Sequence, residues 1–409
     1  MRLAAVSPFV DRHHGTERAL AELLERLASD YGCEIHLYAQ RVEGLRASDP
    51  RSARTVNTSQ SGAIFWHKVP SIPGPHVLQF VAWIFLNGAL RKCHALFSRA
   101  SYDLVLSPGI NCFHPDVVIV HALFHRLKEL SRENDRDSAA GAGFFRRMHR
   151  RVYYGLLTLL ERCTYTDPAV VLAAVSNRTA ALVKKYFHRD DVSVIPNAVD
   201  TEHFSAAARL ARRPQSRQKR GFGGEDFVLL LIGNDWRNKG LLTILQAISA
   251  LSLLPIRLLV VGNDDADPFR AQAAKLAIGE RCRWELPSAD VLDFYAAVDV
   301  YVSPSLEDSF GLPVAEAMAC GLPVITSVCA GVADAIHDAV DGFVLRDPRD
   351  AQTLSQLIER LHSDPELRRK IGEAAPQGAL AWDWNRNAAA TWELLKSAAA
   401  KKRSSSPAS

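Results

Sequence analysis

The chain has 409 residues, of which 48% are hydrophobic and 23% are charged. This length predicts two or three domains, and the ordinary globular composition excludes a collagen, a largely disordered chain and a disulfide-stapled miniprotein. The formal net charge of +4 is too small for a protein that binds nucleic acid over its whole surface. The seven cysteines include no CxxC pair, which favours a reducing compartment, so we expect a cytoplasmic protein.

The apolar segments predict no membrane span. The N-terminus lacks the long apolar segment of a signal peptide and predicts a short strand followed by a polar turn. The longest apolar stretch, residues 77–90, is too short to cross a bilayer and predicts a buried helix.

In the first half of the chain, short apolar runs alternate with segments of helical periodicity, which is typical of βα units around a parallel sheet. Strands are predicted at residues 3–7, 34–39, 103–107, 117–122, 172–176 and 192–196. Between the first two, the leucines at 20, 23, 24 and 27 recur at helical spacing. Thr16 is placed to cap this helix and Gly32 follows its end.

Residues 206–224 are rich in Arg, Gln, Ser and Gly and predict a linker or exposed loop. A second series of strands follows at residues 227–233, 257–262, 283–286, 300–305, 323–327 and 343–345. We therefore predict an α/β protein of two doubly wound domains, with a ligand site at the carboxyl ends of the strands, facing the cleft between domains. Residues 397–409, rich in Ala, Lys and Ser, predict a disordered tail.

Residues 304–323, PSLEDSFGLPVAEAMACGLP, form the most informative segment. A predicted strand leads into an acidic turn, and Pro313 suits the first position of a helix. The backbone amides near Phe310, Gly311 and Leu312 would then lie at a helix N-terminus, which is suited to bind an anion.

Two acids of this segment, Asp308 and Glu316, are placed to meet ligand hydroxyls on either side of a bound phosphate. The segment resembles the E-x7-E motif of retaining glycosyltransferases of the GT-B fold, in the large family 4 group (group 1 glycosyltransferases). The resemblance extends from residue 1 to about residue 396. It implies that Asp308 contacts the transferred sugar, that Glu316 binds the ribose of a nucleotide-sugar donor, and that the intervening amides hold sugar and diphosphate.

The first acid departs from the family pattern, because Asp308 stands where the family has Glu. Either the shorter carboxylate reaches the sugar or the neighbouring Glu307 replaces it. An isolated acidic turn before a helix would be an ordinary N-cap, but the adjoining Phe-Gly-Leu-Pro sequence and the tandem architecture favour the functional interpretation.

The loop at residues 229–240 carries Arg237 and Lys239. Cations beside a departing diphosphate stabilise its developing charge, which is work that a metal does elsewhere. In the resembling family this loop reads Gly-Arg-x4-Lys-Gly. Lys239 matches that pattern, while Asn234 occupies the arginine position, so Arg237 could supply the missing cation. The alternative is two solvated surface cations.

The first half of the chain contributes further candidates. Gly15 resembles the second residue of the family's Gly-Gly loop, and His14 stands in place of the first glycine as a possible acceptor contact. Gly15 allows close approach of a ligand to the backbone. His121 resembles the family's strand-end histidine, where a neutral imidazole can bind a sugar hydroxyl. A satisfied core histidine is the alternative for His121 and the favoured interpretation for His125. Asn197, in a segment similar to the family's Pro-Asn-Gly-Val-Asp signature, marks the crossing between domains.

Residues 144–157 are the local basic patch, with arginines at 146, 147, 150 and 151 beside Phe144, Tyr153 and Leu157. This composition suits a helix on an anionic membrane surface. A helix that packs one face on its domain and solvates its arginines explains the pattern nearly as well.

No metal site is predicted. Asp264, Asp265 and Asp267 follow a strand as an ordinary Asp-rich turn, and no His/Cys spacing indicates zinc. The resembling enzymes generally lack a structural metal, so we expect no cofactor beyond the nucleotide-sugar co-substrate.

The resulting hypothesis is a retaining glycosyltransferase that moves a hexose from a nucleotide-sugar donor to a glycan or lipid-linked acceptor in cell-surface polysaccharide or lipopolysaccharide synthesis. Residues 1–200, joined by a helix at 382–396, would hold the acceptor, and residues 201–381 the donor. The protein would be cytoplasmic, with possible contact to the inner face of the cytoplasmic membrane. The alternatives are a nucleotide-sugar 2-epimerase of the same fold and a catalytically dead nucleotide-sugar-binding module.

Overall fold

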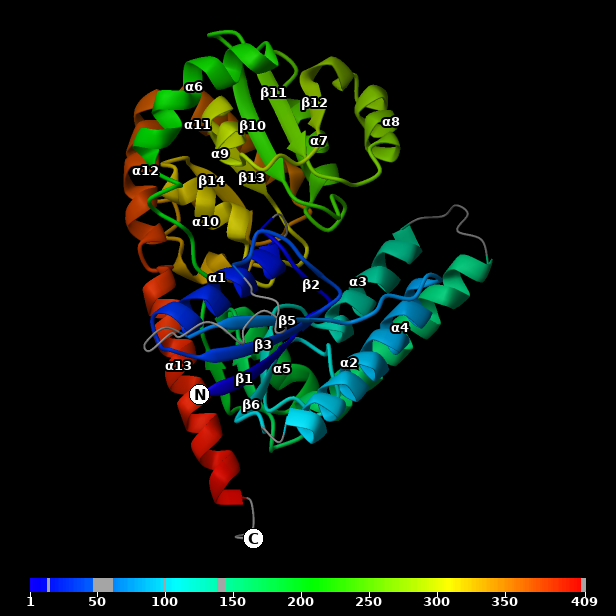
Figure 1. Ribbon diagram of the computed structural model, residues 1–409. Coiled ribbons are helices and arrows are strands. Elements are labelled where there is room, and N and C mark those ends of the chain that lie inside the picture. Colours follow the sequence, from blue (N-terminus) through cyan, green and yellow to red (C-terminus); the bar gives the residue numbers. More distant parts are fainter. Residues whose placement is uncertain (13–14, 47–61, 99–100, 138–143, 406–409) are drawn as a thin grey trace. The chain divides into compact units, whose positions relative to one another are not determined.

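The computed structural model describes residues 1–12, 15–46, 62–98, 101–137 and 144–405 (Figure 1). The chain forms two compact units, Met1–Pro196 with Trp384–Ser409, and Asn197–Asp383. The sequence placed these divisions at residues 200/201 and 381/382. Each unit is an α/β body built on a parallel sheet, as predicted.

The sheet of the first unit has the strand order β5-β3-β1-β6-β7-β8-β9, and all of its neighbouring strands run parallel. Its strands are β1 (Arg2–Val6), β3 (Glu34–Ala39), β5 (Ile64–Lys68), β6 (Leu104–Pro108), β7 (Val117–Val120), β8 (Val171–Ala174) and β9 (Val192–Val194). A separate short pair joins β2 (Phe9–Val10) to β4 (Arg41–Val42). The sequence missed β5, an edge strand whose aromatic residues are only half-buried.

The helices of the first unit are α1 (Gly15–Ser29), α2 (His76–Ser98), α3 (Phe124–Asp137), α4 (Phe144–Tyr165), α5 (Asn177–Phe187) and α13 (Trp384–Ser405). The four leucines predicted on one face of α1 are all buried. Helix α2 covers the apolar stretch predicted as a buried helix, but only part of its surface is buried: Trp83 packs in the core, whereas Phe85 is exposed.

Helix α13 belongs to the first unit although it ends the chain. The rings of Trp392 and Tyr31 lie 5.3 Å apart, and the Asn387 side chain donates to the carbonyl of Pro196 over 2.6 Å. The prediction of a disordered tail at 397–409 was wrong for residues 397–405, which continue this helix. Ala398 is buried there and Lys402 pairs with Asp116 at 2.9 Å, so packing and good helix propensity hold the segment in place. Residues 406–409 lie outside the described residues.

The sheet of the second unit has the order β12-β11-β10-β13-β14-β15, again parallel throughout. Its strands are β10 (Phe227–Ile232), β11 (Ile256–Val261), β12 (Cys282–Glu285), β13 (Val300–Ser303), β14 (Val324–Ser327) and β15 (Phe343–Leu345). Its helices are α6 (Ala206–Arg220), α7 (Leu241–Ala250), α8 (Asp267–Lys275), α9 (Leu292–Ala297), α10 (Leu312–Ala319), α11 (Ala351–Ser363) and α12 (Pro365–Ala379), with short 3-10 turns at Gly279–Arg281 and Gly331–Ala335.

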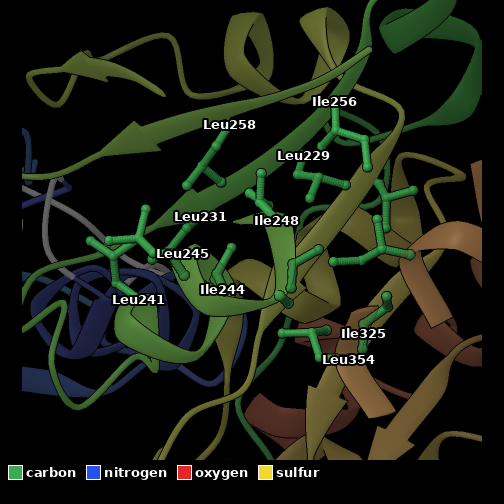
Figure 2. Close-up of a cluster of buried hydrophobic side chains, with 14 of the residues drawn as sticks. Leu229, Leu231, Leu241, Ile244, Leu245, Ile248, Ile256, Leu258, Ile325 and Leu354 are labelled. Carbon is green, nitrogen blue, oxygen red and sulfur yellow. The ribbon is translucent and has the colours of Figure 1, made fainter. Parts of the chain in front are cut away.

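The core of the second unit lies between its sheet and α7. Strand residues are apolar almost without interruption, because helices cover both faces of a parallel sheet. Figure 2 shows side chains of β10 and β11 meeting the buried face of α7; those labelled on these elements are Leu229, Leu231, Ile256, Leu258, Leu241, Ile244, Leu245 and Ile248. This packed layer gives the loops at the strand ends a rigid support.

The predicted linker at residues 206–224 is instead largely helix α6. Ser205 caps its first turn, and Gly221 ends it with a left-handed φ of 69°. Its arginines are not a sign of solvent exposure: Arg217 and Arg220 are buried, and Arg213 pairs with Asp299 at 2.6 Å. The prediction failed because it took a charged composition for exposure, whereas these guanidinium groups have carboxylate and carbonyl partners within the unit.

Candidate functional site

Two loops of the second unit meet where its strand order reverses. Residues 233–240 follow β10, and residues 304–311 follow the neighbouring parallel strand β13. The chain winds from β10 to β11 on one side and returns to β13 on the other, so the carboxyl ends of these strands form a topological switch point. Ligands of open α/β sheets bind at such a point.

Lys239 and Asp308 are in direct contact at this edge. The Lys239 Nζ lies 2.6 Å from Asp308 Oδ2, and the two side chains are only 16% and 15% exposed. Two residues that the sequence assigned separately to diphosphate and sugar therefore form one ion pair in one site.

The backbone of the two loops is closely fitted around this pair. The Asn238 side chain donates to the carbonyl of Glu307 over 2.8 Å, and the amide of Leu306 donates to the carbonyl of Asn238 over 2.7 Å. Gly240 has a φ of 79°, and a Cβ there would lie 2.2 Å from the carbonyl oxygen of Pro304. Only glycine fits where the two loops touch at Gly240 and Pro304. The position of Lys239 is therefore fixed by the contacts of Asn238 before it and of Gly240 after it.

The turn that carries Asp308 is held from its other side by residues 329–332. The Asp308 amide donates to the carbonyl of Cys329 over 2.9 Å, and its carbonyl accepts from Gly331 over 2.9 Å. The carbonyl of Phe310 accepts from Val332 over 2.7 Å, and the Phe310 ring lies 5.7 Å from that of Trp382. These contacts set the geometry of the turn before any ligand arrives.

Helix α10 begins directly after this turn, as predicted. Gly311 precedes it with a φ of 101°, Leu312 is its first residue, and Pro313 follows. The amides of a first helical turn have no acceptor within their own helix, and they carry the positive end of the helix dipole. Because Asp308 and Lys239 lie just before this terminus, the site combines an anion-binding helix start with an ammonium and a carboxylate.

Glu316 is buried on α10, and its Oε2 accepts a hydrogen bond from the hydroxyl of Tyr295 at 2.8 Å. Glu307 is also buried, and its carbonyl takes part in the contact with Asn238. Arg237 is half-buried in the same loop as Lys239. The sequence interpretation missed Asn238, which occupies an unspecified position of the loop motif, and Tyr295, which lies outside the motifs that it used.

Two candidates of the first unit, His121 and Gly15, lie at the carboxyl edge of their own sheet. His121 directly follows β7, and burial lowers its pKa to about 4, so its imidazole is neutral at pH 7. Gly15 is exposed and begins α1. His14 lies outside the described residues.

His125 is a satisfied structural histidine, as favoured from the sequence. Its Nδ1 lies 2.7 Å from Glu161 Oε2. The same buried carboxylate accepts from the amides of Phe124 and His125 over 2.6 and 3.0 Å and so caps the start of α3. Burial raises the pKa of Glu161, against the lowering effect of these hydrogen bonds.

The Asp-rich turn after β11 accepts hydrogen bonds from backbone amides of the loop after β10 and of the turn itself. Asp264 accepts from the amide of Trp236 over 2.8 Å, and Asp265 accepts from the amide of Asp267 over 3.1 Å. Within the part of the chain that the structure describes, no group of three or more His, Cys, Asp or Glu residues could hold a metal ion.

Residues 144–157, the predicted basic patch, form the first part of α4. Leu157 is fully buried in the core of its unit, whereas Met148, Arg151 and Val152 are exposed. One face of this helix therefore packs on the domain. Among the described helices, none is long and apolar enough to cross a membrane.

Two Rossmann-like units in one chain, each on a parallel sheet, define the GT-B fold class. A crystal structure of WaaG, a glycosyltransferase involved in lipopolysaccharide biosynthesis, shares this fold with a TM-score of 0.75 and 22% identity, covering 97% of this chain and 98% of that one. Anabaena Alr3699/HepE in complex with UDP-glucose has a TM-score of 0.70 at 17% identity, over 97% of this chain and 100% of that one.

Sequence comparison identifies the family. Residues 13–203 match Glycosyltransferase Family 4, and residues 212–378 match Glycosyl transferases group 1. The chain belongs to this family of GT-B glycosyltransferases.

Curated relatives match over part of their length. Lipopolysaccharide glucosyltransferase WaaG of Escherichia coli K12 is 27% identical over 242 residues, which are 57% of this chain and 63% of that protein. The D-inositol 3-phosphate glycosyltransferase of Arthrobacter sp. FB24 is 30% identical over 243 residues, 57% of this chain and 56% of that protein. The chain thus spans less than two thirds of the length of these relatives.

Proposed function

We propose that this protein is a retaining glycosyltransferase that moves a hexose from a nucleotide-sugar donor to a glycan or lipid-linked acceptor, in the assembly of cell-surface polysaccharide or lipopolysaccharide. The observation that carries the proposal is the Lys239–Asp308 pair, with an N⋯O distance of 2.6 Å, directly before the start of α10. The UDP-glucose complex of a neighbour with this fold and the lipopolysaccharide glucosyltransferase among the relatives support the substrate classes.

The proposed chemistry uses the charges of this site. The donor diphosphate would meet Lys239, Arg237 and the amides at Gly311 and Leu312. As the bond between the sugar carbon and the diphosphate oxygen breaks, these fixed groups stabilise the negative charge that moves onto the leaving group. The acceptor hydroxyl then forms the new bond to that carbon from the same face, which retains the anomeric configuration, and passes its proton to the departing diphosphate oxygen. Lys239 and Arg237 supply the positive charge in this scheme, and no metal ion is required.

The two acids and the first unit have separate roles in the proposal. Glu316 binds the ribose, and Asp308 orients the transferred sugar. Gly15 and His14 would approach the donor through the loop before α1, and His121 would bind a sugar hydroxyl as a neutral imidazole. The low pKa of His121 supports that role, because only the neutral ring offers both a donor and an acceptor nitrogen near pH 7.

Turnover with a panel of donors tests this function. The full chain is incubated with UDP-, GDP- and ADP-sugars and bacterial glycolipid acceptors, in the presence and absence of EDTA, and free nucleoside diphosphate is measured. We expect release with one nucleotide class, increased by acceptor and insensitive to EDTA. Epimerised donor without released diphosphate would instead identify a 2-epimerase, and binding without any turnover would identify a dead sugar-binding module.

We also propose that the first unit contacts an anionic membrane. Helix α2 presents Phe85, Leu96 and Phe97 to solvent, the last two 78% and 88% exposed, and Lys92 of the same helix is also exposed. Among the side chains of helix α4 that the structure describes, three apolar residues and two arginines are exposed: Met148, Val152, Leu159, Arg151 and Arg162. Apolar side chains next to cations suit the headgroup region of anionic lipid, where a lipid-linked acceptor is found.

Flotation with vesicles of neutral phosphatidylcholine, with and without phosphatidylglycerol, tests this contact. We expect salt-sensitive binding only to the anionic vesicles, and its loss in a Leu96→Ser, Phe97→Ser variant. Leu253→Ser is the matched control, because Leu253 is 96% exposed in the second unit. Equal binding by both variants, or no binding by the unchanged protein, contradicts the proposal.

A further inference from the structure

Tyr295 makes a buried contact with one of the two acids of the site. Its side chain is fully buried on α9, and its hydroxyl lies 2.8 Å from Glu316 Oε2 and 3.2 Å from the carbonyl of Pro313. A hydroxyl has one proton to donate, and the shorter, charge-assisted bond goes to the carboxylate.

The short helix that carries Tyr295 is fixed in place by α6. Asp293 of α9 pairs with Arg220 at 3.0 Å and with Lys219 at 3.1 Å, and it accepts a hydrogen bond from Ser216. Burial alone would raise the pKa of Asp293, but these partners lower it to about 2. The carbonyl of Val298, directly after the helix, accepts from Arg213 over 2.7 Å. Both ends of α9 are thus tied to the same neighbouring helix.

The ring of Tyr295 is held as firmly as its helix. Its centroid lies 5.9 Å from that of Phe204 in an edge-on arrangement and 6.2 Å from that of Tyr301. Burial and the neighbouring Glu316 charge raise the pKa of Tyr295 well above its ordinary value, so the hydroxyl stays protonated and acts as a donor toward the carboxylate. The phenol therefore supplies a stationary donor to one oxygen of Glu316.

We propose that Tyr295 is a positioning residue for the donor nucleotide, which holds the Glu316 carboxylate in the orientation that receives the ribose hydroxyls. This inference rests on the proposed function, in which Glu316 binds the ribose. A carboxylate that is already fixed loses little conformational entropy when a ligand hydroxyl binds it, so the hydrogen bond contributes more to affinity. Tyr295 touches no ligand in this scheme and acts through Glu316 alone.

Calorimetry with nucleotides that differ in their ribose hydroxyls tests this role. UDP and 2′,3′-dideoxy-UDP are titrated into the full chain, with GDP and ADP and their dideoxy forms as the alternative bases. We expect the unchanged protein to prefer the ribonucleotide. Tyr295→Phe should weaken ribonucleotide binding about tenfold and leave dideoxynucleotide binding unchanged. Tyr301→Phe is the matched control, since it removes another buried hydroxyl, one that donates to the carbonyl of Ile232 over 3.4 Å.

The double variant Tyr295→Phe, Glu316→Gln keeps the test decisive if Tyr295→Phe alone folds poorly, because it does not leave a buried carboxylate short of a donor. We expect this double variant to bind like Glu316→Gln alone. A Tyr295→Phe protein that retains the full preference for ribose, or that weakens both nucleotides equally, overturns the inference. An unchanged protein that binds none of the three nucleoside diphosphates contradicts the proposed function itself, and with it this role.

Discussion

The ammonium nitrogen of Lys239 lies 2.6 Å from a carboxylate oxygen of Asp308, although the two residues are 69 positions apart in the chain. They meet because their loops follow neighbouring parallel strands, and because Gly240 and Asn238 allow the two loops to touch. The protein thus holds the Lys239 ammonium in a fixed position. In the proposed function, the Lys239 ammonium would exchange part of its contact with Asp308 for the diphosphate. The Asp308 carboxylate would exchange part of the same contact for the sugar.

Lys239→Ala should lower kcat by about 10²- to 10³-fold, because it removes a fixed charge from the leaving diphosphate in the transition state. Lys239→Arg should recover part of the rate, since it restores the charge with a different shape. Initial rates of nucleoside diphosphate release measure both. A Lys239→Ala enzyme with an unchanged kcat and a raised KM would assign the lysine to ground-state binding only.

Asp308→Asn and Glu307→Gln separate the two candidates for the sugar contact. We expect Asp308→Asn to lower kcat/KM at least 100-fold, about 2.7 kcal/mol of transition-state stabilisation, and Glu307→Gln to change it less than tenfold. The reason is the direct contact between Asp308 and Lys239, which places Asp308 at the cation site. The reverse order of the two effects would assign the sugar to Glu307.

Gly240→Ala should destabilise the second unit by more than about 3 kcal/mol, because the new Cβ would meet the carbonyl of Pro304 at a φ of 79°. Gly221→Ala is the matched control, since Gly221 also has a positive φ, of 69°, but an added Cβ would meet open space. That change should cost only about 1 kcal/mol. Urea denaturation of the two variants compares them, and equal losses would refute the steric explanation.

Acid should destabilise the protein through His121. Its pKa is about 4 in the folded chain and about 6.5 when unfolded. Between these pH values, His121 is therefore protonated in the unfolded state and neutral in the folded state. Protonation of His121 therefore leaves the free energy of unfolding unchanged above about pH 6.5 and lowers it as the pH falls toward 4. We expect His121→Asn to lose less stability than the unchanged protein between pH 7.5 and 4.5. The exposed His76→Asn serves as the control, and a matching loss in both variants would exclude His121 as the cause.

Most strands were predictable because a buried parallel strand is a short, almost uniformly apolar run. Residues 34–39 and 343–345 agree with β3 and β15 to the residue. The errors occur where the composition of a segment does not indicate how deeply it is buried. Helix α6 is charged yet has two buried arginines, and β5 is an edge strand with half-buried aromatic residues.

The site was predictable as a set of motifs but not as a geometry. The acids and the lysine were identified through a family pattern, whereas the contact between Lys239 and Asp308 depends on strand order, which no local sequence signal encodes. The sequence did not indicate Tyr295 for a similar reason: its role follows from the contact of its hydroxyl with Glu316, which lies 21 residues away in the chain.

The first unit is built from two separate stretches of the chain, with α13 as its final piece. During synthesis, the second unit is therefore complete and able to fold before α13 leaves the ribosome. At that point the first unit still lacks α13. Tyr31, just beyond the end of α1, stays without its Trp392 contact until α13 emerges. A truncation that removes α13 would thus damage the half of the protein that was translated first.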